Sequence, residues 1–139
     1  MVGTIRTFDQ DMRADIKERI KHTAELTAQA AGAKADVHID HGYPVTVNNP
    51  ELTTKMMPTL EAVAGKENVV ITDLITGAED FSYYALETPG LFFFLGVTPE
   101  GQDAKSAPSN HSPHFYIDEK ALPLGVSALT QVVFDYLDK

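Results

Sequence analysis

The chain has 139 residues, and its 43% hydrophobic and 22% charged content is typical of one folded domain in water. A formal net charge of −9 with no basic run argues against binding to nucleic acid or to an anionic membrane surface. Cysteine is absent, which excludes disulfides and thiolate metal sites and favours a cytoplasmic location. No apolar run approaches the ~20 residues of a membrane span.

The N-terminal part predicts a strand followed by a long helix. Residues 3–8 mix polar and apolar positions with β-branched side chains, which indicates a half-buried strand. Asp9 is a candidate N-cap, and Gly32 is the expected stop of a helix over about residues 10–31. The apolar positions recur at helical spacing: Met12, Ile16, Ile20, Ala24, Ala28 and Ala31.

A second strand is predicted over residues 34–41, where apolar and polar side chains alternate. This pattern is typical of a strand with one covered face, most often antiparallel. His38 and His41 fall on opposite faces, so we interpret both as surface side chains rather than partners at one metal. The segment Gly42-Tyr43-Pro44 is expected to end or bend the strand.

The middle of the chain predicts a helix and a short strand. Asn49 followed by proline at position 50 is a helix start, and the helix should run to about residue 64 and stop at Gly65. Pro58 lies inside this helix and should kink or split it. Residues 69–72 are predicted as a short buried strand.

Two further elements precede the main loop. A glycine turn at Gly77 leads into a short predicted helix, with Glu79 and Asp80 at its start, where carboxylates also favour the helix dipole. That capping role is the structural alternative to any function of these two residues. Residues 91–95 are continuously apolar, which is typical of a strand covered on both faces.

Residues 106–119 form a polar loop that carries two of the five histidines, His111 and His114. Pro108 and Pro113 restrict the backbone on either side of His111. A stiffened loop after a buried strand is a common place for catalytic or binding side chains. The alternative is an ordinary surface loop.

Asp118 is the expected cap of a last helix, in which Pro123 lies near the start. This helix carries apolar residues at Leu122, Val126, Leu129, Val133 and Leu137. The order of elements, β-α-β followed by α-β-α-β-loop-α, predicts an α/β class with α+β character.

Four ordered motifs resemble one protein family over essentially the whole chain. They are residues 3–9 (Gly-Thr-Ile-Arg-Thr-Phe-Asp), Gly42-Tyr43-Pro44 with Asn48-Asn49, residues 77–82 (Gly-Ala-Glu-Asp-Phe-Ser), and His111-Ser112-Pro113 with Phe115 and Asp118-Glu119. Together they resemble the C-terminal part of the metal-dependent amidohydrolases of the aminoacylase and carboxypeptidase group, of hippurate, aminobenzoyl-glutamate and auxin-conjugate hydrolase type.

The resemblance implies a zinc-exopeptidase-type catalytic domain with an inserted ferredoxin-like lid that also forms a homodimer. Residues 1–43 would be the C-terminal β-α-β half of the lid, and residues 44–139 the C-terminal part of the catalytic domain. The general base and most metal ligands of the family lie in an upstream region. No catalytic residue is therefore assigned to this chain, which looks like the final third of an enzyme.

Residue by residue, His111 matches the family's last metal ligand, and an imidazole suits zinc, manganese or a similar divalent ion, two per complete site. Arg6 matches the lid arginine that binds the free carboxylate of an N-acyl amino acid, for which a guanidinium is well shaped. Gly77 and Glu79 match a turn that lines the substrate cleft. Arg6 as an ordinary surface charge is the alternative.

Two functions follow as hypotheses. The chain is part of a hydrolase that cleaves N-acyl or N-aroyl amino acids and is inactive by itself. Alternatively, it is a non-catalytic dimerisation module or a truncated remnant.

Overall fold

The computed structural model describes residues 1–138, which divide into two units. Unit 1 consists of residues 1–48 and 72–90, and unit 2 consists of residues 49–71 and the chain from Leu91 onward. The helices of unit 1 are α1 (Gln10–Ala30) and α3 (Phe81–Glu87). Those of unit 2 are α2 (Pro50–Ala64), the short 3-10 helix η1 (Lys66–Asn68) and α4 (Ala121–Leu137).

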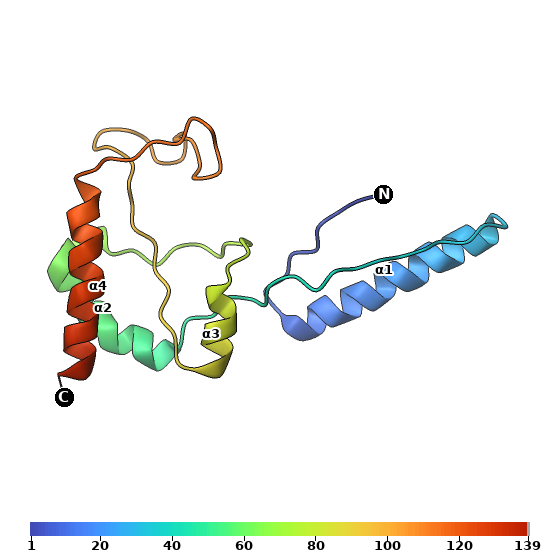
Figure 1. Cartoon of the computed structure of the whole chain (residues 1–139), viewed down its shortest axis with the longest axis horizontal. Helices are drawn as coiled ribbons and strands as arrows, with labels where there is room; N and C mark the ends of the chain where they lie inside the picture. The colour runs from blue at the N-terminus through green and yellow to red at the C-terminus, as the bar shows by residue number, and fades with distance from the viewer. Residues whose placement is uncertain (139) are drawn as a thin grey trace. The chain divides into compact units, whose positions relative to one another are not determined.

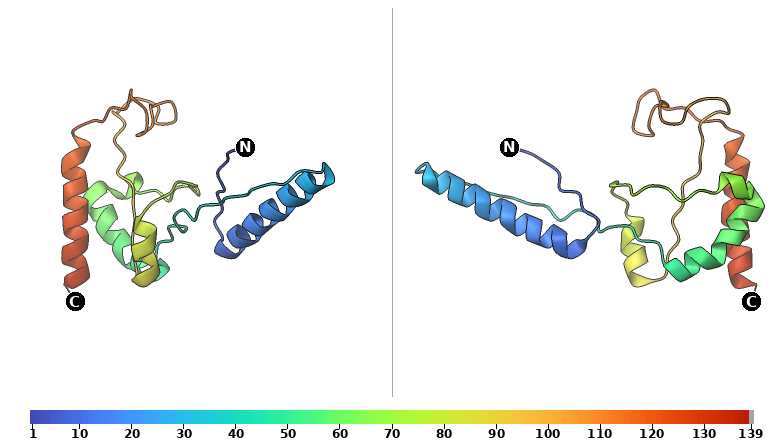
Figure 2. Two further views of the ribbon diagram at one scale, coloured as in Figure 1. Left: turned by 45° about the vertical axis from the view of Figure 1, so that its right-hand side comes forward. Right: turned by 180° about the vertical axis from the view of Figure 1, so that it is seen from behind.

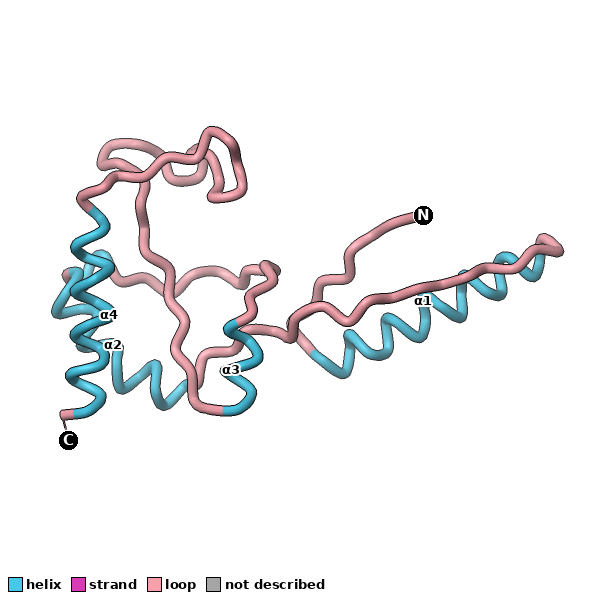
Figure 3. The backbone as a smooth tube through the Cα atoms, viewed as in Figure 1, coloured by secondary structure: helices cyan, strands magenta, loops and turns pink. Residues whose placement is uncertain are grey.

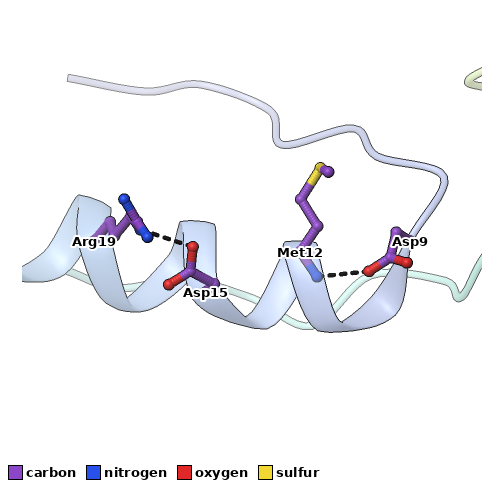
Figure 4. A network of polar contacts seen from close by, with 4 residues as sticks. All are labelled: Asp9, Met12, Asp15 and Arg19. Atoms are coloured by element: carbon purple, nitrogen blue, oxygen red, sulfur yellow. Dashed lines mark hydrogen bonds and ion pairs between the residues drawn. The ribbon is translucent and has the colours of Figure 1, made fainter.

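The predicted start of α1 is confirmed. Asp9 has an extended backbone, and its carboxylate accepts a hydrogen bond of 2.7 Å from the Met12 N–H (Figure 4). One turn further on, Asp15 and Arg19 form an exposed i,i+4 ion pair with an N–O distance of 2.7 Å (Figure 4). The hydrogen bond and the charge of Asp15 raise the pKa of Arg19.

The predicted stop of α1 is also confirmed. Gly32 has a φ of 69°, a left-handed conformation that glycine adopts without steric cost. Its N–H donates to the Gln29 carbonyl at 2.9 Å, and the Ala33 N–H donates to the Ala28 carbonyl at 2.9 Å. This pair of bonds is a Schellman motif, which satisfies the last carbonyls and turns the chain back.

Residues 34–44 run back along α1, as the views of Figures 1 and 2 agree. Arg13 holds the end of this segment, because its guanidinium donates to the carbonyls of Gly42 and Tyr43 at 2.8 Å each. Along this segment the side chains alternate as predicted. The apolar members Ala35, Val37 and Ile39 are half-buried, and Asp36, His38 and Asp40 are exposed.

The helix α2 begins at Pro50, with the Asn49 carboxamide accepting from the Leu52 N–H at 2.8 Å, and Gly65 caps its end as predicted. Pro58 does not split it, which corrects that part of the prediction. The helix continues because its neighbours supply packing: Met56 and Leu60 are buried, at 2% and 9% exposure.

The helix α4 packs beside α2 (Figures 1 and 2) and completes the small core of unit 2 with Ala128. The buried Thr59 hydroxyl donates to the Asp135 carboxylate at 2.5 Å, and Lys55 lies 4.5 Å from the centre of the Tyr136 ring. A Cβ added at Gly125 would lie 2.8 Å from Leu95 Cδ2, so the glycine allows the residue 91–95 segment to approach α4 closely.

The four strand predictions are wrong for this structure. Residues 3–8, 34–41, 69–72 and 91–95 lie outside regular secondary structure, and no strand occurs anywhere in residues 1–138 (Figure 3). The expected burial fails too, since Ile71 is 90% exposed and Phe94 is 62% exposed. A strand exists only where its backbone pairs with a neighbouring segment, and such partners are missing among the described residues. The α/β class is therefore not confirmed.

The start of α4 also differs from the prediction. Lys120, not Asp118, occupies the N-cap position, and it makes no side-chain capping bond. Asp118 lies two residues earlier, where its carboxylate accepts from the Lys120 N–H at 3.0 Å in a local turn. No helix within residues 1–138 is long and apolar enough to cross a membrane. A cytoplasmic location stays a prediction.

Candidate functional site

Arg6 lies in unit 1 beside the turn that precedes α3. Its Nη1 donates a hydrogen bond to the Thr76 carbonyl, seventy residues along the chain. The side chain stays exposed, and a guanidinium has five N–H donors in all. One of these donors therefore holds the side chain against the turn, while the guanidinium stays open to solvent. The structure thus brings Arg6 together with the segment that carries Gly77.

Gly77 and Glu79 lie on the short connection from Thr76 into α3. Gly77 is exposed and Glu79 is half-buried. The Glu79 carbonyl accepts from the N–H of Ser82 at 3.2 Å and from its hydroxyl at 2.5 Å. Asp80 occupies the N-cap position without a side-chain capping bond. The backbone of this turn, rather than its carboxylates, therefore sets the start of α3.

His111 lies in unit 2, in a loop that one hydrogen bond closes at its base. The Asp118 N–H donates to the Val97 carbonyl at 2.8 Å and brings the two ends of the loop together. Inside the loop, the Ser112 N–H donates to the Ser109 carbonyl at 2.8 Å, and the Phe115 N–H donates to the Ser112 carbonyl at 3.0 Å. These consecutive turns place His111 on an exposed bend.

An exposed imidazole is a suitable ligand for zinc or a similar ion. A complete protein site needs three or four such ligands. The described part of the chain contains no group of three or more His, Asp or Glu side chains that could share a metal ion. The residues present thus fit a contribution of one ligand by His111. His114 is also exposed, and its N–H donates to the Ser112 hydroxyl at 3.1 Å.

The other predicted surface histidines are exposed as expected. His38 pairs with Asp40 at 2.9 Å, and the His41 ring lies 2.8 Å from Lys17 Nζ. Arg13 has a role in the fold that its place on a helix surface does not indicate, because its guanidinium binds the Gly42 and Tyr43 carbonyls. Its contact with the Gly42 and Tyr43 carbonyls has no local sequence signal, since 29 and 30 residues separate the partners.

Comparison with protein families identifies the family of this chain. Residues 3–135 match the model of "Peptidase family M20/M25/M40". The chain belongs to this family. The match supports a zinc-exopeptidase-type fold. It covers most of both units and includes the positions of Arg6, Gly77, Glu79 and His111.

Individual members of the M20/M25/M40 family are similar along nearly the entire chain. The thermostable carboxypeptidase 2 of Saccharolobus solfataricus is 35% identical over 140 residues, which is 100% of this chain and 34% of that protein. The IAA-amino acid hydrolase ILR1-like 6 of Arabidopsis thaliana is 30% identical, over 98% of this chain and 30% of its own length. An N-acetyldiaminopimelate deacetylase of Streptococcus suis is 32% identical, over 92% and 32% respectively.

The chain therefore spans about a third of the length of the curated relatives it matches. No solved structure matches it.

Proposed function

We propose that this chain forms the C-terminal part of a metal-dependent hydrolase that cleaves the amide bond of N-acyl or N-aroyl amino acids. The observation that carries the proposal is the family match over residues 3–135. The names of the relatives support hydrolysis, since they are a carboxypeptidase, an amino acid hydrolase and a deacetylase.

Arg6 is the proposed site for the free carboxylate of the substrate. The bond to the Thr76 carbonyl uses one donor and orients the planar guanidinium next to Gly77. A carboxylate that accepts two parallel hydrogen bonds from such a group is held in position as well as in orientation. Gly77 and Glu79 would line the same substrate site, with Glu79 partly shielded from water.

His111 is the proposed metal ligand of this chain. Two divalent ions, zinc or manganese, would polarise the amide carbonyl and activate a water molecule when bound. The exposed imidazole supplies one ligand. Because the described residues hold no group of three or more candidate ligands, we propose that the remaining ligands and the general base belong to residues outside this chain.

A homodimer formed through residues 1–43 is part of the same proposal. No residue of α1 is buried, and its apolar side chains Met12 and Ile20 are 55% and 42% exposed. These side chains offer contact area to a second copy. Residues 44–139 would then belong to the catalytic domain.

The proposal can be tested with a chimera in which this chain replaces the matching third of the thermostable carboxypeptidase 2. We expect the chimera to hydrolyse N-benzoylglycine and to lose this activity with a chelator. The 139-residue chain alone should not turn over this substrate with added zinc, manganese or cobalt. Metal-dependent turnover by the chain alone would contradict the proposal that the other metal ligands and the general base lie outside it. A folded but inactive chimera would contradict the proposal that this chain is part of such a hydrolase.

Arg6→Lys in the chimera tests the carboxylate site. Lysine keeps the charge but loses the planar pair of donors. A lost hydrogen bond to a charged group costs ~1.5–3 kcal/mol, so KM for N-benzoylglycine should rise roughly 10- to 150-fold. N-Benzoylglycinamide lacks the free carboxylate and serves as the control substrate. Equal losses on both substrates would show that Arg6 has a structural role.

A further inference from the structure

Two half-exposed tyrosine rings meet in unit 1. The centroids of the Tyr43 and Tyr83 rings are 5.7 Å apart with their planes at 64°, an edge-to-face contact. Tyr43 is 49% exposed and Tyr83 is 51% exposed. Edge-to-face geometry is the arrangement that aromatic rings prefer when they pack. Each tyrosine residue therefore keeps about half of its surface accessible to a ligand.

The backbone of Tyr43 is fixed from two directions. The Arg13 guanidinium donates to the carbonyls of Gly42 and Tyr43 at 2.8 Å each. The proline at position 44 restricts Tyr43 to an extended conformation. The ring is therefore presented by a rigid backbone rather than by a free loop.

Tyr83 is fixed by the start of α3. The preceding Ser82 is fully buried, at 0% exposure, and its hydroxyl donates to the Glu79 carbonyl at 2.5 Å. Phe81 packs on the buried Gly90, where an added Cβ would lie 3.0 Å from the Phe81 ring. An aromatic pair that is already ordered loses little conformational freedom when it binds a ligand.

One member of the pair, Tyr83, lies on the same segment as the proposed carboxylate site, and Tyr43 contacts it from residues 34–44. Arg6 donates to the Thr76 carbonyl, and the chain from Thr76 to Tyr83 passes directly through Gly77 and Glu79 into α3. A cationic group for a carboxylate and a planar apolar surface are the two features that an N-aroyl amino acid would need.

We propose that Tyr43 and Tyr83 form an aromatic subsite that receives the aroyl or other planar apolar group of the substrate. This inference rests on the proposed function, and it narrows the substrate class to N-aroyl amino acids over N-acetyl amino acids. Arg13 acts through Tyr43 and is a positioning residue of the subsite.

The test is ligand binding to the 139-residue chain, followed by NMR of the tyrosine rings. The chain has five tyrosines and no tryptophan, so the ring signals are few. N-Benzoylglycine should shift the ring signals of Tyr43 and Tyr83, and N-acetylglycine should not. An aromatic contact of the usual strength predicts that Tyr43→Leu and Tyr83→Leu each weaken N-benzoylglycine binding about two- to tenfold. Tyr43→Phe and Tyr83→Phe keep the rings and should bind nearly as well as the unmodified chain.

Tyr84→Leu is the matched control, because Tyr84 is the next residue of α3 and is 68% exposed. Circular dichroism of each variant establishes that the helices persist. If Tyr84→Leu weakens binding as much as Tyr83→Leu, or if the Tyr43 and Tyr83 signals do not move, the aromatic subsite is wrong.

Benzamide separates this proposal from the proposed function. It has the aromatic ring and the amide but no carboxylate. If benzamide shifts the Tyr43 and Tyr83 signals while Arg6→Lys has no effect on N-benzoylglycine binding, the subsite stands and the role of Arg6 fails. If Arg6→Lys weakens N-benzoylglycine and N-acetylglycine equally and benzamide shifts neither ring, the carboxylate site stands and the aromatic subsite is overturned.

Discussion

At the scale of single residues, His111 carries the sharpest expectation. In the chimera, His111→Ala removes one proposed metal ligand, and we expect kcat to fall by roughly 100-fold or more. Loss of a residue that only hydrogen-bonds to a metal ligand typically lowers activity by roughly 10- to 100-fold. His114→Ala is the matched control, because His114 is also exposed and lies three residues away in the same loop. The measurement is kcat together with the metal content of the purified proteins.

Metal content distinguishes a ligand from a structural residue. Loss of metal in His111→Ala, with an unchanged circular dichroism spectrum, would support ligation. Equal metal content and equal kcat in the two histidine variants would leave His111 as an ordinary surface side chain.

At the scale of elements, the contact between α2 and α4 includes one polar pair, Thr59 and Asp135. The hydrogen bond from Thr59 and a second one from Gln131 lower the pKa of Asp135 below its ordinary value. A depressed carboxyl pKa adds stability above the pKa of the unfolded state, ~3.9, and this stability is lost as the pH falls through the folded value. The folded chain should therefore become easier to unfold with urea as the pH drops from about 5 toward 3.

Thr59→Val tests this contact because valine keeps the shape of the side chain and removes the hydroxyl. We expect a lower urea midpoint at pH 7 and a smaller loss of stability between pH 5 and pH 3. Thr59→Ser retains a hydroxyl and should preserve most of the acid dependence. An unchanged pH profile in Thr59→Val would show that the acid sensitivity arises elsewhere.

The helices were predictable because their signals are local. Asp9 and Asn49 sit directly before the helices they cap, and Gly32 and Gly65 follow the ends. The strands were not predictable in the same way, since apolar runs such as residues 91–95 specify extended pairing only where a partner segment is available. The polar turn at Asp118 was one local signal interpreted wrongly, because its carboxylate binds the Lys120 N–H instead of capping α4.

The candidate site residues were assigned only from the resemblance, and their roles stay predictions. The sequence alone gives no signal for the contact of Arg6 with Thr76, which joins residues seventy positions apart. For the same reason, the edge-to-face contact of Tyr43 and Tyr83 appears only in the structure. Patterns of spacing report neighbours along a helix or strand, and contacts between distant segments lie beyond their reach.

At the scale of the whole molecule, the exposed apolar residues of α4 predict self-association. These side chains lie on one face at helical spacing and are 47%, 66%, 62%, 56% and 69% exposed: Leu122, Val126, Leu129, Val133 and Leu137. Contiguous exposed apolar surface of this kind favours association. Unpaired extended segments add to this tendency.

Sedimentation equilibrium of the 139-residue chain should therefore show an average mass that rises with protein concentration. Val126→Glu places a charge on the apolar face and should shift the chain toward the monomer. Ser127→Glu adds the same charge to an exposed position beside the face and should change the mass much less. A strict monomer at high concentration would contradict the prediction.

The hydrogen bond from the Asp118 N–H to the Val97 carbonyl also makes the opening rate of the His111 loop measurable. Because that bond closes the base of the loop, the Asp118 amide proton can exchange with solvent deuterium only when the loop opens. Its exchange rate therefore reports how often the loop that carries His111 opens, and it can be measured without added metal or substrate. Exchange at this one amide should slow when a bound metal ion or substrate holds the loop closed. The Asp118 amide can therefore be used to detect binding at His111.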